Sequence, residues 1–593
     1  MNKRNNIHLF VKYSISNKKS IISNQKKDTL LFLNLTNHST IEPFNNKKNV
    51  KRNKFYIAFL LYVLGIASCN SNDFEKAYNS INTDEITSYV KIIGGDDFMG
   101  RKPFTKGEDT TVAYIASVFE QIGLKPANKG SYFQEVPLVE VSNVADKLMK
   151  FSSGKNTLTL NYQSDFVAVS RQLVDSVELT KNQLVFVGYG IVAPEYQWND
   201  YQGVDVKGKT VVVLVNDPGL VGEDKKFFKG KEMTYYGRWT YKYEEAARQG
   251  AAAVLLVHNT LGAGYPWSVV VNGAVGSDLY LVPNDKYASR CKVEAWITGE
   301  AARKLFQFAQ LDTNLIHAAA KPAFKAVEMN CGLDFSLRST FQYKTSKNVL
   351  AYIEGSERPD EVIVYSAHWD HLGIVAPVNG DSIINGAVDN GTSLAWMFSI
   401  AKAFMQLDQK PKRSILFFAP TGEETGLIGS SYYVENPCFA LDKTVANINN
   451  DLMLPYGEMR DVMITGFGQS ELDQWLEKAA KKQNRYLMPD PNPHTGMYFR
   501  SDHFSFAKAG IPSLFARGNC DHLTKGKAWM QQKELDWLAN NYHKTTDQYE
   551  TWWDLKGVEQ DAKLLFEVGY ELSNSPVFPQ WSKSSEFNKG VRK

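Results

Sequence analysis

Short apolar runs and helix-like runs alternate between residues 347 and 573. Residues 392–407 and 470–484 have apolar positions at helical spacing, and the runs around them are rich in β-branched and aromatic residues. The runs expected to be strands are NVLAYIEG (348–355), EVIVYSAH (361–368), SILFFAPTG (414–422), KTVANINND (443–451), DVMITG (461–466) and IPSLFA (511–516). This alternation predicts an α/β fold with a central mixed, mostly parallel sheet flanked by helices, with functional sites at the carboxyl ends of strands.

The chain before this region shows two further patterns. Residues 85–93 and 110–124 have helical spacing, and Gly123 is placed to stop the second helix. From about residue 148 the pattern changes to short β-type runs bounded by Gly, Asn and Asp. The domains expected are the first part of an α/β domain (70–147), an inserted β-rich domain (148–326), the main part of the α/β domain (327–575) and a tail (576–593).

Length and charge narrow the classes of function. A chain of 593 residues exceeds what one hydrophobic core supports, so two or three domains are expected. The formal net charge is +3, but the first 69 residues carry twelve Lys and Arg against Asp28 and Glu42, and the remainder carries 55 basic and 62 acidic residues. A mildly acidic body lacks the clustered cations that nucleic acid binding requires. No nucleic acid partner is therefore expected.

A targeting signal is expected at residues 51–69. The apolar run 55–69 is too short to span a membrane and follows a cluster of basic residues. Its end, IASC, resembles the bacterial lipobox, which implies a lipoprotein signal peptide, export to the cell envelope (periplasm or outer membrane) and membrane attachment only through lipid on Cys69. Because such signals stand at chain starts, residues 1–50 are interpreted as a non-native or disordered extension, with translation starting near Val50.

The other four cysteines give no motif. They are Cys291, Cys331, Cys438 and Cys520, and they show no CxxC spacing, which argues against a thiolate zinc site. An oxidising compartment permits disulfides between them, and isolated buried thiols fit the sequence equally well.

Several polar residues with metal-binding side chains fall at the ends of expected strands. His368 ends the run 361–368, and Asp370 is placed to accept a hydrogen bond from its ring and raise its basicity. Asp389 lies in the turn INGAVDNGTS before a helical run. Each residue alone has an ordinary explanation, because a strand-end His is usually structural and Asp is common in turns and helix caps. Taken singly, these positions do not establish a site.

Four more candidates change this interpretation. Glu423 and Glu424 follow one expected strand, Asp451 ends another, and His543 lies in a polar loop before the last helical stretch. Adjacent carboxylates repel each other without a cation, whereas a dication lets one act as a ligand and the other move protons. Two His and three or four acids at one sheet edge therefore predict a site for two Zn²⁺ ions.

Five motifs in order carry a family resemblance: HxDH, GAxDNG, GEExGLxGS, NxD and YHxxxD. Over about residues 84–573 the chain resembles the secreted co-catalytic di-zinc aminopeptidases, in the superfamily of glutamate carboxypeptidase and the transferrin receptors. The resemblance implies a zinc-exopeptidase sandwich with Glu423 as the general base and Asp370 as the partner of His368. The ligands that it implies are His368 and Asp451 for one zinc, Glu424 and His543 for the other, and Asp389 as the bridge.

Two further segments resemble parts of these peptidases. Residues 185–218 resemble the inserted protease-associated domain, which flanks the active site and does no chemistry. In GMYFRSDHFSFAKAGIP, Tyr498 stands where relatives have a tyrosine that contacts the tetrahedral intermediate, and Asp502 matches an acid nearby. Cysteines that flank this tyrosine in some relatives are replaced by Gly496 and Arg500. Tyr498 is therefore interpreted either as catalytic or as a packing tyrosine with a bonded hydroxyl.

The activity expected is hydrolysis of a peptide or protein by Glu423-assisted attack of a zinc-bound water, by an aminopeptidase. Arg500 leaves a carboxypeptidase open, because binding a free carboxylate needs an Arg or a Lys. Two alternatives of another kind share the fold, a non-catalytic receptor-like protein and a glutaminyl-cyclase-like transferase. The sequence leaves side-chain specificity and oligomeric state open.

Overall fold

The structure, a computed structural model, describes residues 73–222, 224 and 226–588. The expected extension (1–50), the signal (51–69) and Cys69 lie outside these residues. In the described part of the chain, no helix is long and apolar enough to cross a membrane. The cysteines Cys291, Cys331, Cys438 and Cys520 are all free thiols.

A central sheet forms where the sequence predicts it. Its strands, in order across the sheet, are β13 (Val327–Ile353, through its last residues), β17 (Arg413–Ala419), β14 (Arg358–Ser366), β18 (Thr444–Asn449), β21 (Ser513–Arg517), β19 (Asp461–Thr465) and β20 (Tyr486–Pro489). The β17, β14, β18 and β21 strands run parallel, while β13 and β19 are antiparallel to their neighbours in that block. The predicted mixed, mostly parallel sheet is confirmed.

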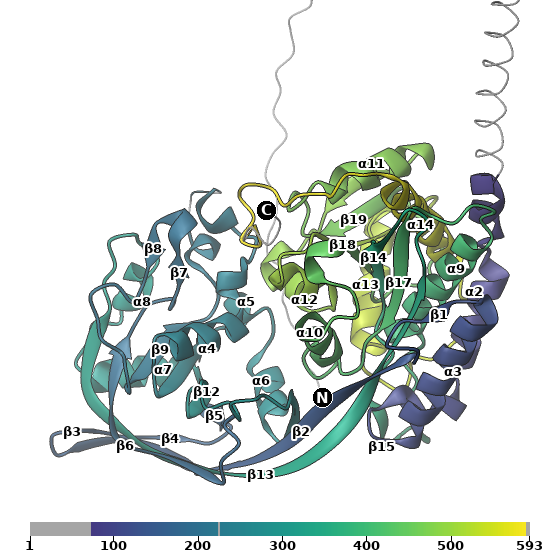
Figure 1. Ribbon diagram of the computed structural model, residues 1–593. Helices are drawn as coiled ribbons and strands as arrows, with labels where there is room; N and C mark the ends of the chain where they lie inside the picture. The colour runs from purple at the N-terminus through teal and green to yellow at the C-terminus, as the bar shows by residue number, and fades with distance from the viewer. Residues whose placement is uncertain (1–72, 223, 225, 589–593) are drawn as a thin grey trace, which may run out of the picture. The chain divides into compact units, whose positions relative to one another are not determined.

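Alternate residues of the middle strands face two apolar layers. Tyr365 of β14 and Phe417 of β17 stack with ring centroids 5.7 Å apart, on the side of helices α9 (Ser393–Met405) and α14 (Lys556–Asn574). Val364 and Phe418, one residue along each strand, pack toward helices α10 (Ile428–Glu435) and α12 (His503–Lys508). Burying each such side chain contributes about 1.5–3 kcal/mol. The sheet is therefore covered on both faces, as Figure 1 shows, which explains its continuous apolar strands.

The N-terminal helices join the first of these layers. The apolar faces of helices α2 (Thr83–Ile93) and α3 (Lys106–Ile122) pack against α9. The Thr105 hydroxyl accepts a hydrogen bond from the Gly107 amide at the start of α3. The helix ends at Gly123, whose φ of 92° is accessible to glycine. The predicted helix stop at Gly123 is confirmed.

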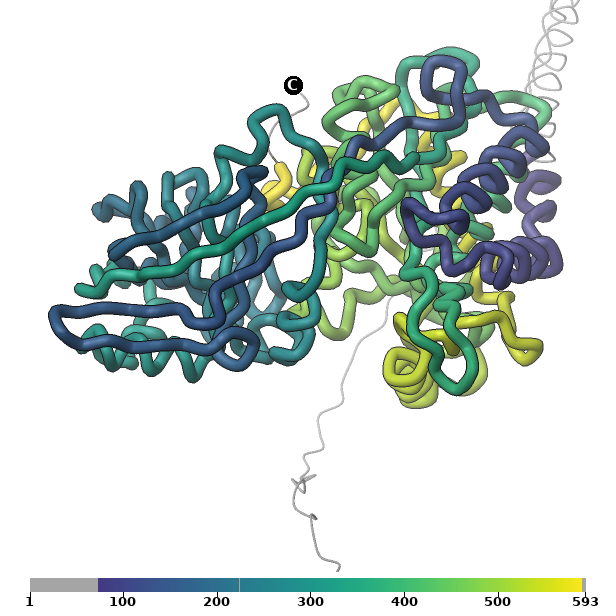
Figure 2. Tube along the Cα trace, turned by 90° about the horizontal axis from the view of Figure 1, so that it is seen from below, coloured from purple at the N-terminus to yellow at the C-terminus, as the bar shows by residue number. Residues whose placement is uncertain are grey.

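Two long strands connect the inserted part with the central sheet. Strand β2 (Phe133–Ala145) pairs with β13 in antiparallel register, from Phe133 opposite Val349 to Ala145 opposite Leu337. Both strands run from one part into the other (Figure 1; Figure 2). The first residues of β13 pair with β6 (Ser176–Phe186) in the inserted part. The boundary predicted between residues 326 and 327 is therefore the start of a strand that both parts share.

The strands of the inserted part join the same sheet through β13 and pack against two apolar layers. These strands are β3 (Leu148–Ser153), β4 (Asn156–Asn161), β5 (Phe166–Val169), β6, β9 (Thr210–Leu214), β10 (Ala253–His258) and β12 (Val293–Thr298). Helices α4 (Trp239–Arg248) and α7 (Gly299–Phe308) pack against β10. The part is richer in helix than the β-type runs indicate. Helix α4 begins at Trp239, directly after Arg238, and both residues belong to the site described below.

The end of the chain is packed, in contrast to the tail expected at 576–593. Trp581 Nε1 donates a hydrogen bond of 2.9 Å to the Gly510 carbonyl in the α/β part, which becomes the catalytic part of the proposal below. Glu586 forms an ion pair of 2.7 Å with Lys229 in the inserted part, and Phe587 is 1% exposed. Isolated aromatic residues give no periodic pattern, which is why the sequence does not reveal this packing. Residues 576–588 thus form a strap that contacts both parts.

Trp581→Ala is expected to destabilise the protein by about 3 kcal/mol or more, the usual cost of deleting a buried Trp side chain, measured by urea unfolding. Trp552→Ala is the matched control, because Trp552 is 54% exposed, and it should cost under about 1 kcal/mol. Equal effects of the two substitutions would show that the strap adds nothing to stability.

Candidate metal centre

The candidate ligands meet at one edge of the sheet. Strand β14 ends at Ser366 and β18 ends at Asn449, so His368 and Asp451 follow two adjacent parallel strands. Glu423 and Glu424 follow β17 on the other side of β14. Two further ligands come from loops, Asp389 just before α9 and His543 just after α13 (Gly526–Asn540). The predicted clustering at the carboxyl ends of the strands is what the structure shows.

The ring nitrogens and carboxylates of this edge face one another. The Nε2 atom of His368 lies 3.4 Å from Asp389 Oδ1 and 3.4 Å from Asp451 Oδ1. The Nε2 atom of His543 lies 3.3 Å from Asp389 Oδ2 and 3.1 Å from Glu424 Oε2. Asp389 therefore turns one oxygen toward each histidine. This is the arrangement in which one carboxylate can serve two ions.

The donor atoms fit metal ions. Two groups of His, Asp and Glu have ligand atoms within 4.8 Å of one another, His368 with Glu423 and Asp451, and His371 with Asp389 and Glu424. In the described part of the chain, His368 Nε2, His543 Nε2 and Asp451 Oδ1 are buried without a hydrogen-bond partner. Unpaired buried polar atoms are costly, and imidazole nitrogen and carboxylate oxygen are zinc ligands. The donor set thus fits Zn²⁺.

Asp370 acts on a different neighbour from the one expected. His368 Nδ1 lies 3.1 Å from the Asp370 main-chain carbonyl and 3.7 Å from its carboxylate. The carboxylate instead accepts hydrogen bonds from the backbone amides of Glu423 (3.1 Å) and Glu424 (3.3 Å). The backbone of Asp370 therefore orients the His368 ring, while its side chain fixes the loop that carries both glutamates.

The pKa values of the two adjacent glutamates are shifted in opposite directions. Burial raises the pKa of Glu423 well above its usual value; His368 opposes this rise, and the Asp451 and Glu424 carboxylates add to it. For Glu424, burial is outweighed by His371 and His543, which lower its pKa to about 2. A pair of acids whose environments separate their pKa values is typical of one proton-carrying and one permanently ionised carboxylate.

His371 is a residue of this site to which the sequence assigned no role. Its Nδ1 atom lies 2.6 Å from Glu424 Oε1, and its ring lies 5.7 Å from the His543 ring. It is fully buried. The only signal in the sequence is its place as the last residue of HWDH, next to a carboxylate that needs a partner. We assign to His371 the role of orienting the Glu424 side chain.

His371→Phe is expected to lower zinc affinity about 10- to 100-fold, the usual effect of losing a partner that orients a ligand. Competition of each protein with a fluorescent zinc chelator measures this affinity. His317→Phe, an exposed position in the inserted part, is the control and should leave it unchanged. An unaltered affinity in His371→Phe would remove the role given to His371.

The loop that carries Asp389 is held from two sides. Arg101 is fully buried and donates to the main-chain carbonyls of Trp369 (2.8 Å), Gly386 (2.9 Å) and Asp389 (3.0 Å). On the other side, the Asp547 carboxylate accepts hydrogen bonds of 3.0 Å from the amides of Val388 and Asp389. Preorganised ligands need such support. Arg101 was not singled out from the sequence, and Asp547 entered only as the last residue of the YHxxxD motif, without a role.

Tyr498 lies away from the carboxylates. Its ring packs 4.8 Å from the His503 ring and 5.7 Å from the Phe587 ring, centroid to centroid, and it lines a small separate cavity. Burial raises the pKa of its hydroxyl, and the nearby acids are Glu586, Asp473 and Glu232 rather than the site carboxylates. The structure does not bring Tyr498 to the site, and its ring contacts favour packing. The bonded hydroxyl expected of a packing tyrosine is not found, since the Tyr498 hydroxyl has no hydrogen-bond partner among the described residues.

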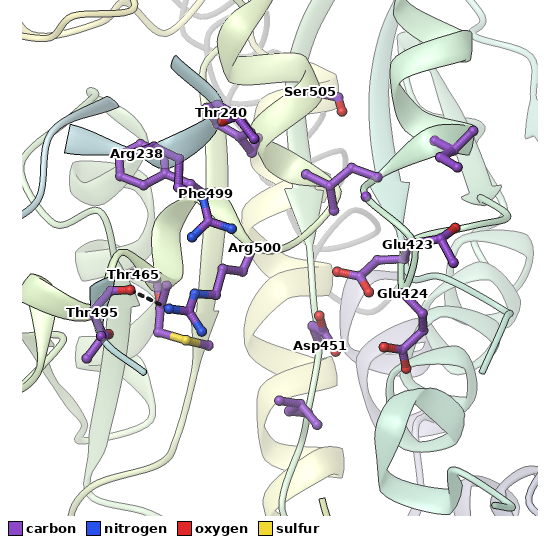
Figure 3. Close-up of a pocket in the computed structure, with 18 of the residues that line it drawn as sticks. Arg238, Thr240, Glu423, Glu424, Asp451, Thr465, Thr495, Phe499, Arg500 and Ser505 are labelled. Carbon is purple, nitrogen blue, oxygen red and sulfur yellow. Dashed lines mark hydrogen bonds between the residues drawn. The ribbon is translucent and has the colours of Figure 1, made fainter. Parts of the chain in front are cut away.

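A pocket of about 1070 Å³ opens on this edge. Glu423, Glu424, Asp451 and His543 line it from the catalytic part, and Figure 3 shows the three carboxylates on one side. Residues of the inserted part, including Arg238 and Trp239, line the opposite side. A ligand that reaches the carboxylates therefore also contacts the inserted part.

Together the α/β sheet and the ligand cluster define a metal-binding site of the kind found in metallopeptidases. Residues 348–567 match peptidase family M28. This match confirms the resemblance drawn from the motifs.

Some individual relatives match this chain over a longer stretch than this region. A glutamate carboxypeptidase 2 homolog of Caenorhabditis elegans is 35% identical over 472 residues, which cover 67% of this chain and 58% of that protein. The aminopeptidase NAALADL1 of Mus musculus is 34% identical over 122 residues, 20% of this chain and 15% of that protein. Among solved structures, an aminopeptidase from Aneurinibacillus sp. strain AM-1 has 17% identity and a TM-score of 0.45, covering 86% of this chain and 97% of its own. The chain spans about half the length of its Caenorhabditis relatives.

Proposed function

We propose that this chain is a zinc-dependent exopeptidase that acts as an aminopeptidase. The observation that carries the proposal is the convergence of two unpaired histidine nitrogens and four carboxylates at the carboxyl edge of the sheet, on a pocket large enough for a short peptide. Perturbed acids with a candidate metal set in a cleft are typical of catalytic sites. The match to peptidase family M28 gives the class of bond that is cut.

Each ligand has a distinct role in this proposal. His368 and Asp451 would hold one zinc ion, Glu424 and His543 would hold a second, and Asp389 would serve both. Bound zinc lowers the pKa of a water toward neutrality and polarises the scissile carbonyl. Asp370 and His371 keep the Glu423–Glu424 loop and the Glu424 side chain in place.

Glu423 is the proton carrier. Its carboxylate lies within 3.9 Å of His368 Nε2, at the centre of the ligand cluster, and it lines the pocket. This place beside the ligand cluster suits a group that takes a proton from the attacking water and delivers it to the leaving amine nitrogen. Glu424, with its lowered pKa, stays ionised and serves as a ligand. The two adjacent acids thus divide ligation from proton transfer.

Zinc content and end-blocked peptides test this function. Two zinc atoms per chain by elemental analysis are expected, with hydrolysis that a chelator abolishes and added zinc restores. A peptide with a free amino terminus should be cut and its acetylated counterpart should not. Cleavage of the acetylated peptide from its carboxyl end would instead identify a carboxypeptidase. Absence of bound zinc and of hydrolysis would favour the receptor-like alternative, and one zinc with cyclisation of an N-terminal Gln would favour the cyclase-like one.

Export and lipid attachment through Cys69 remain predictions from the sequence. Intact-mass analysis of the membrane fraction from the native host should find a mature chain that begins at a lipidated Cys69. A mature chain that retains residues 1–45 would contradict both the signal and the start near Val50.

A further inference from the structure

Two guanidinium groups share the wall of the pocket that faces the carboxylates. Arg238 precedes α4 in the inserted part, and Arg500 follows a short helical turn in the catalytic part. Figure 3 shows both on the opposite side of the pocket from Glu423 and Glu424. Because the two arginines come from different parts of the chain, the pair exists only where these parts meet.

Neither arginine is neutralised by a protein acid. Within the described residues, no carboxylate lies within ion-pair distance of Arg238 or Arg500. Arg500 donates one hydrogen bond, of 2.7 Å, to the Thr495 carbonyl, and its Nε is buried without a partner. Burial and the neighbouring Arg500 lower the pKa of Arg238 to about 10. Two like charges held together without a counterion are unfavourable, so an anionic ligand would stabilise them.

A third arginine that lines the same pocket also has guanidinium nitrogens without a hydrogen-bond partner. Arg517, in β21, is 6% exposed and lines the pocket, and its Nε and Nη1 atoms have no hydrogen-bond partner. Burial raises the pKa of the nearby Glu534 carboxyl, Asn519 and Arg517 oppose that rise, and Arg517 forms no ion pair with Glu534 within 4 Å. A buried guanidinium with two unused donors in the lining of a cavity is an independent indication of a polar ligand.

The rest of the pocket restricts what this anion can be. The opposite wall carries Glu423, Glu424 and Asp451, which the proposed function assigns to zinc binding and proton transfer at a peptide bond. A ligand with one carboxylate at one end and an uncharged peptide group at the other suits both walls. Guanidinium groups pair with carboxylates through two parallel hydrogen bonds. A short peptide has this distribution of charge.

We propose that Arg238 and Arg500 form a subsite that binds a carboxylate of a short peptide substrate while its scissile bond lies at the metal centre. This deepens the proposed function and rests on it. The carboxylate is either the free carboxyl terminus or an acidic side chain, and the two sources share one chemistry. The pocket then selects short peptides whose carboxylate reaches the arginine wall.

Binding to an inactive protein tests the subsite apart from catalysis. Isothermal titration of Glu423→Gln, loaded with zinc, compares one tetrapeptide with a free carboxyl terminus and the same peptide amidated. We expect about tenfold or more weaker binding of the amide. A second pair, amidated peptides with Glu or Gln at the last position, reports binding through an acidic side chain. Equal, measurable binding within both pairs would overturn the proposal, and this comparison needs no arginine variant.

Arginine variants then locate the effect. In the Glu423→Gln background, Arg238→Gln and Arg500→Gln should each remove the difference between the acid and the amide while leaving binding of the amide unchanged. Arg303→Gln, at an exposed position of α7, should keep the difference. A difference that persists in both arginine variants would place the carboxylate elsewhere. If the acid binds more tightly than the amide but the unmodified protein shows no zinc-dependent hydrolysis, the proposed function is refuted and the subsite is retained. If the unmodified protein hydrolyses peptides but the acid and the amide bind equally, the subsite is refuted and the proposed function is retained.

Discussion

Glu423→Gln is expected to lower peptide hydrolysis by about a hundredfold or more while zinc content stays at that of the unmodified protein. The substitution keeps the size of the side chain and the backbone amide that donates to Asp370. It removes only the group that can take a proton from water and return it to the leaving amine. Because Glu423 is assigned no ligand role, the zinc ions should remain bound. Turnover and elemental analysis on the same preparation measure both quantities.

Two comparisons sharpen this result. Glu120→Gln, an exposed position at the end of α3, should leave both activity and zinc unchanged. Glu424→Gln should lose zinc together with activity, because His543 and His371 both lie beside that carboxylate. Undiminished turnover in Glu423→Gln would overturn the role of general base. Loss of zinc in that variant would instead make Glu423 a ligand, as its place in a group with His368 and Asp451 would allow.

The fold and ligand cluster could be predicted because they follow from local patterns combined with one topological rule. Runs such as 361–368 and 443–451 are apolar enough to be buried strands, and parallel strands end at the same edge. Residues directly after them, such as His368 and Asp451, are therefore neighbours even though 83 positions separate them in the chain. The sequence supplies both the strands and their terminal residues.

The residues that support the ligands could not be found in this way. Arg101 donates to the Gly386 carbonyl, 285 positions away, and this contact depends on how α2 and α3 pack against α9. No local pattern marks an arginine whose partners are main-chain carbonyls of distant loops. His371 lies within a motif, but its contact with Glu424 depends on how the loops that carry these two residues pack against each other.

Side-chain direction and strand length were the other limits. Asp370 and Tyr498 occur in the expected motifs, yet one directs its carboxylate to the Glu423–Glu424 backbone and the other packs beside Phe587. A motif fixes the position of a residue in the chain and not the neighbour that its side chain meets. Likewise, β13 runs for 27 residues because β2 and β6 pair with it in succession. Such a strand is set by its partners rather than by its own sequence.

Asp389→Ala is expected to lose zinc as well as activity, because one carboxylate faces both histidines of the site. His368 and His543 hold the pKa of Asp389 well below its usual value against the effect of burial, so the group is ionised and available to metal. Removing it takes a ligand from both positions at once. The loop should stay in place, since Asp547 bonds the backbone amide of residue 389 and not its side chain.

Zinc content after dialysis and the gain in stability on adding zinc test this prediction together. A ligand present at a hundred times its dissociation constant stabilises the folded state by about 2.7 kcal/mol, and the unmodified protein should show a gain of that order. Asp389→Ala should show almost none, whereas Asp360→Ala, an exposed position on β14, should behave as the unmodified protein does. Two zinc atoms per chain in Asp389→Ala would contradict the bridge. One retained atom would assign Asp389 to a single ion and leave the other held by its own histidine and carboxylate.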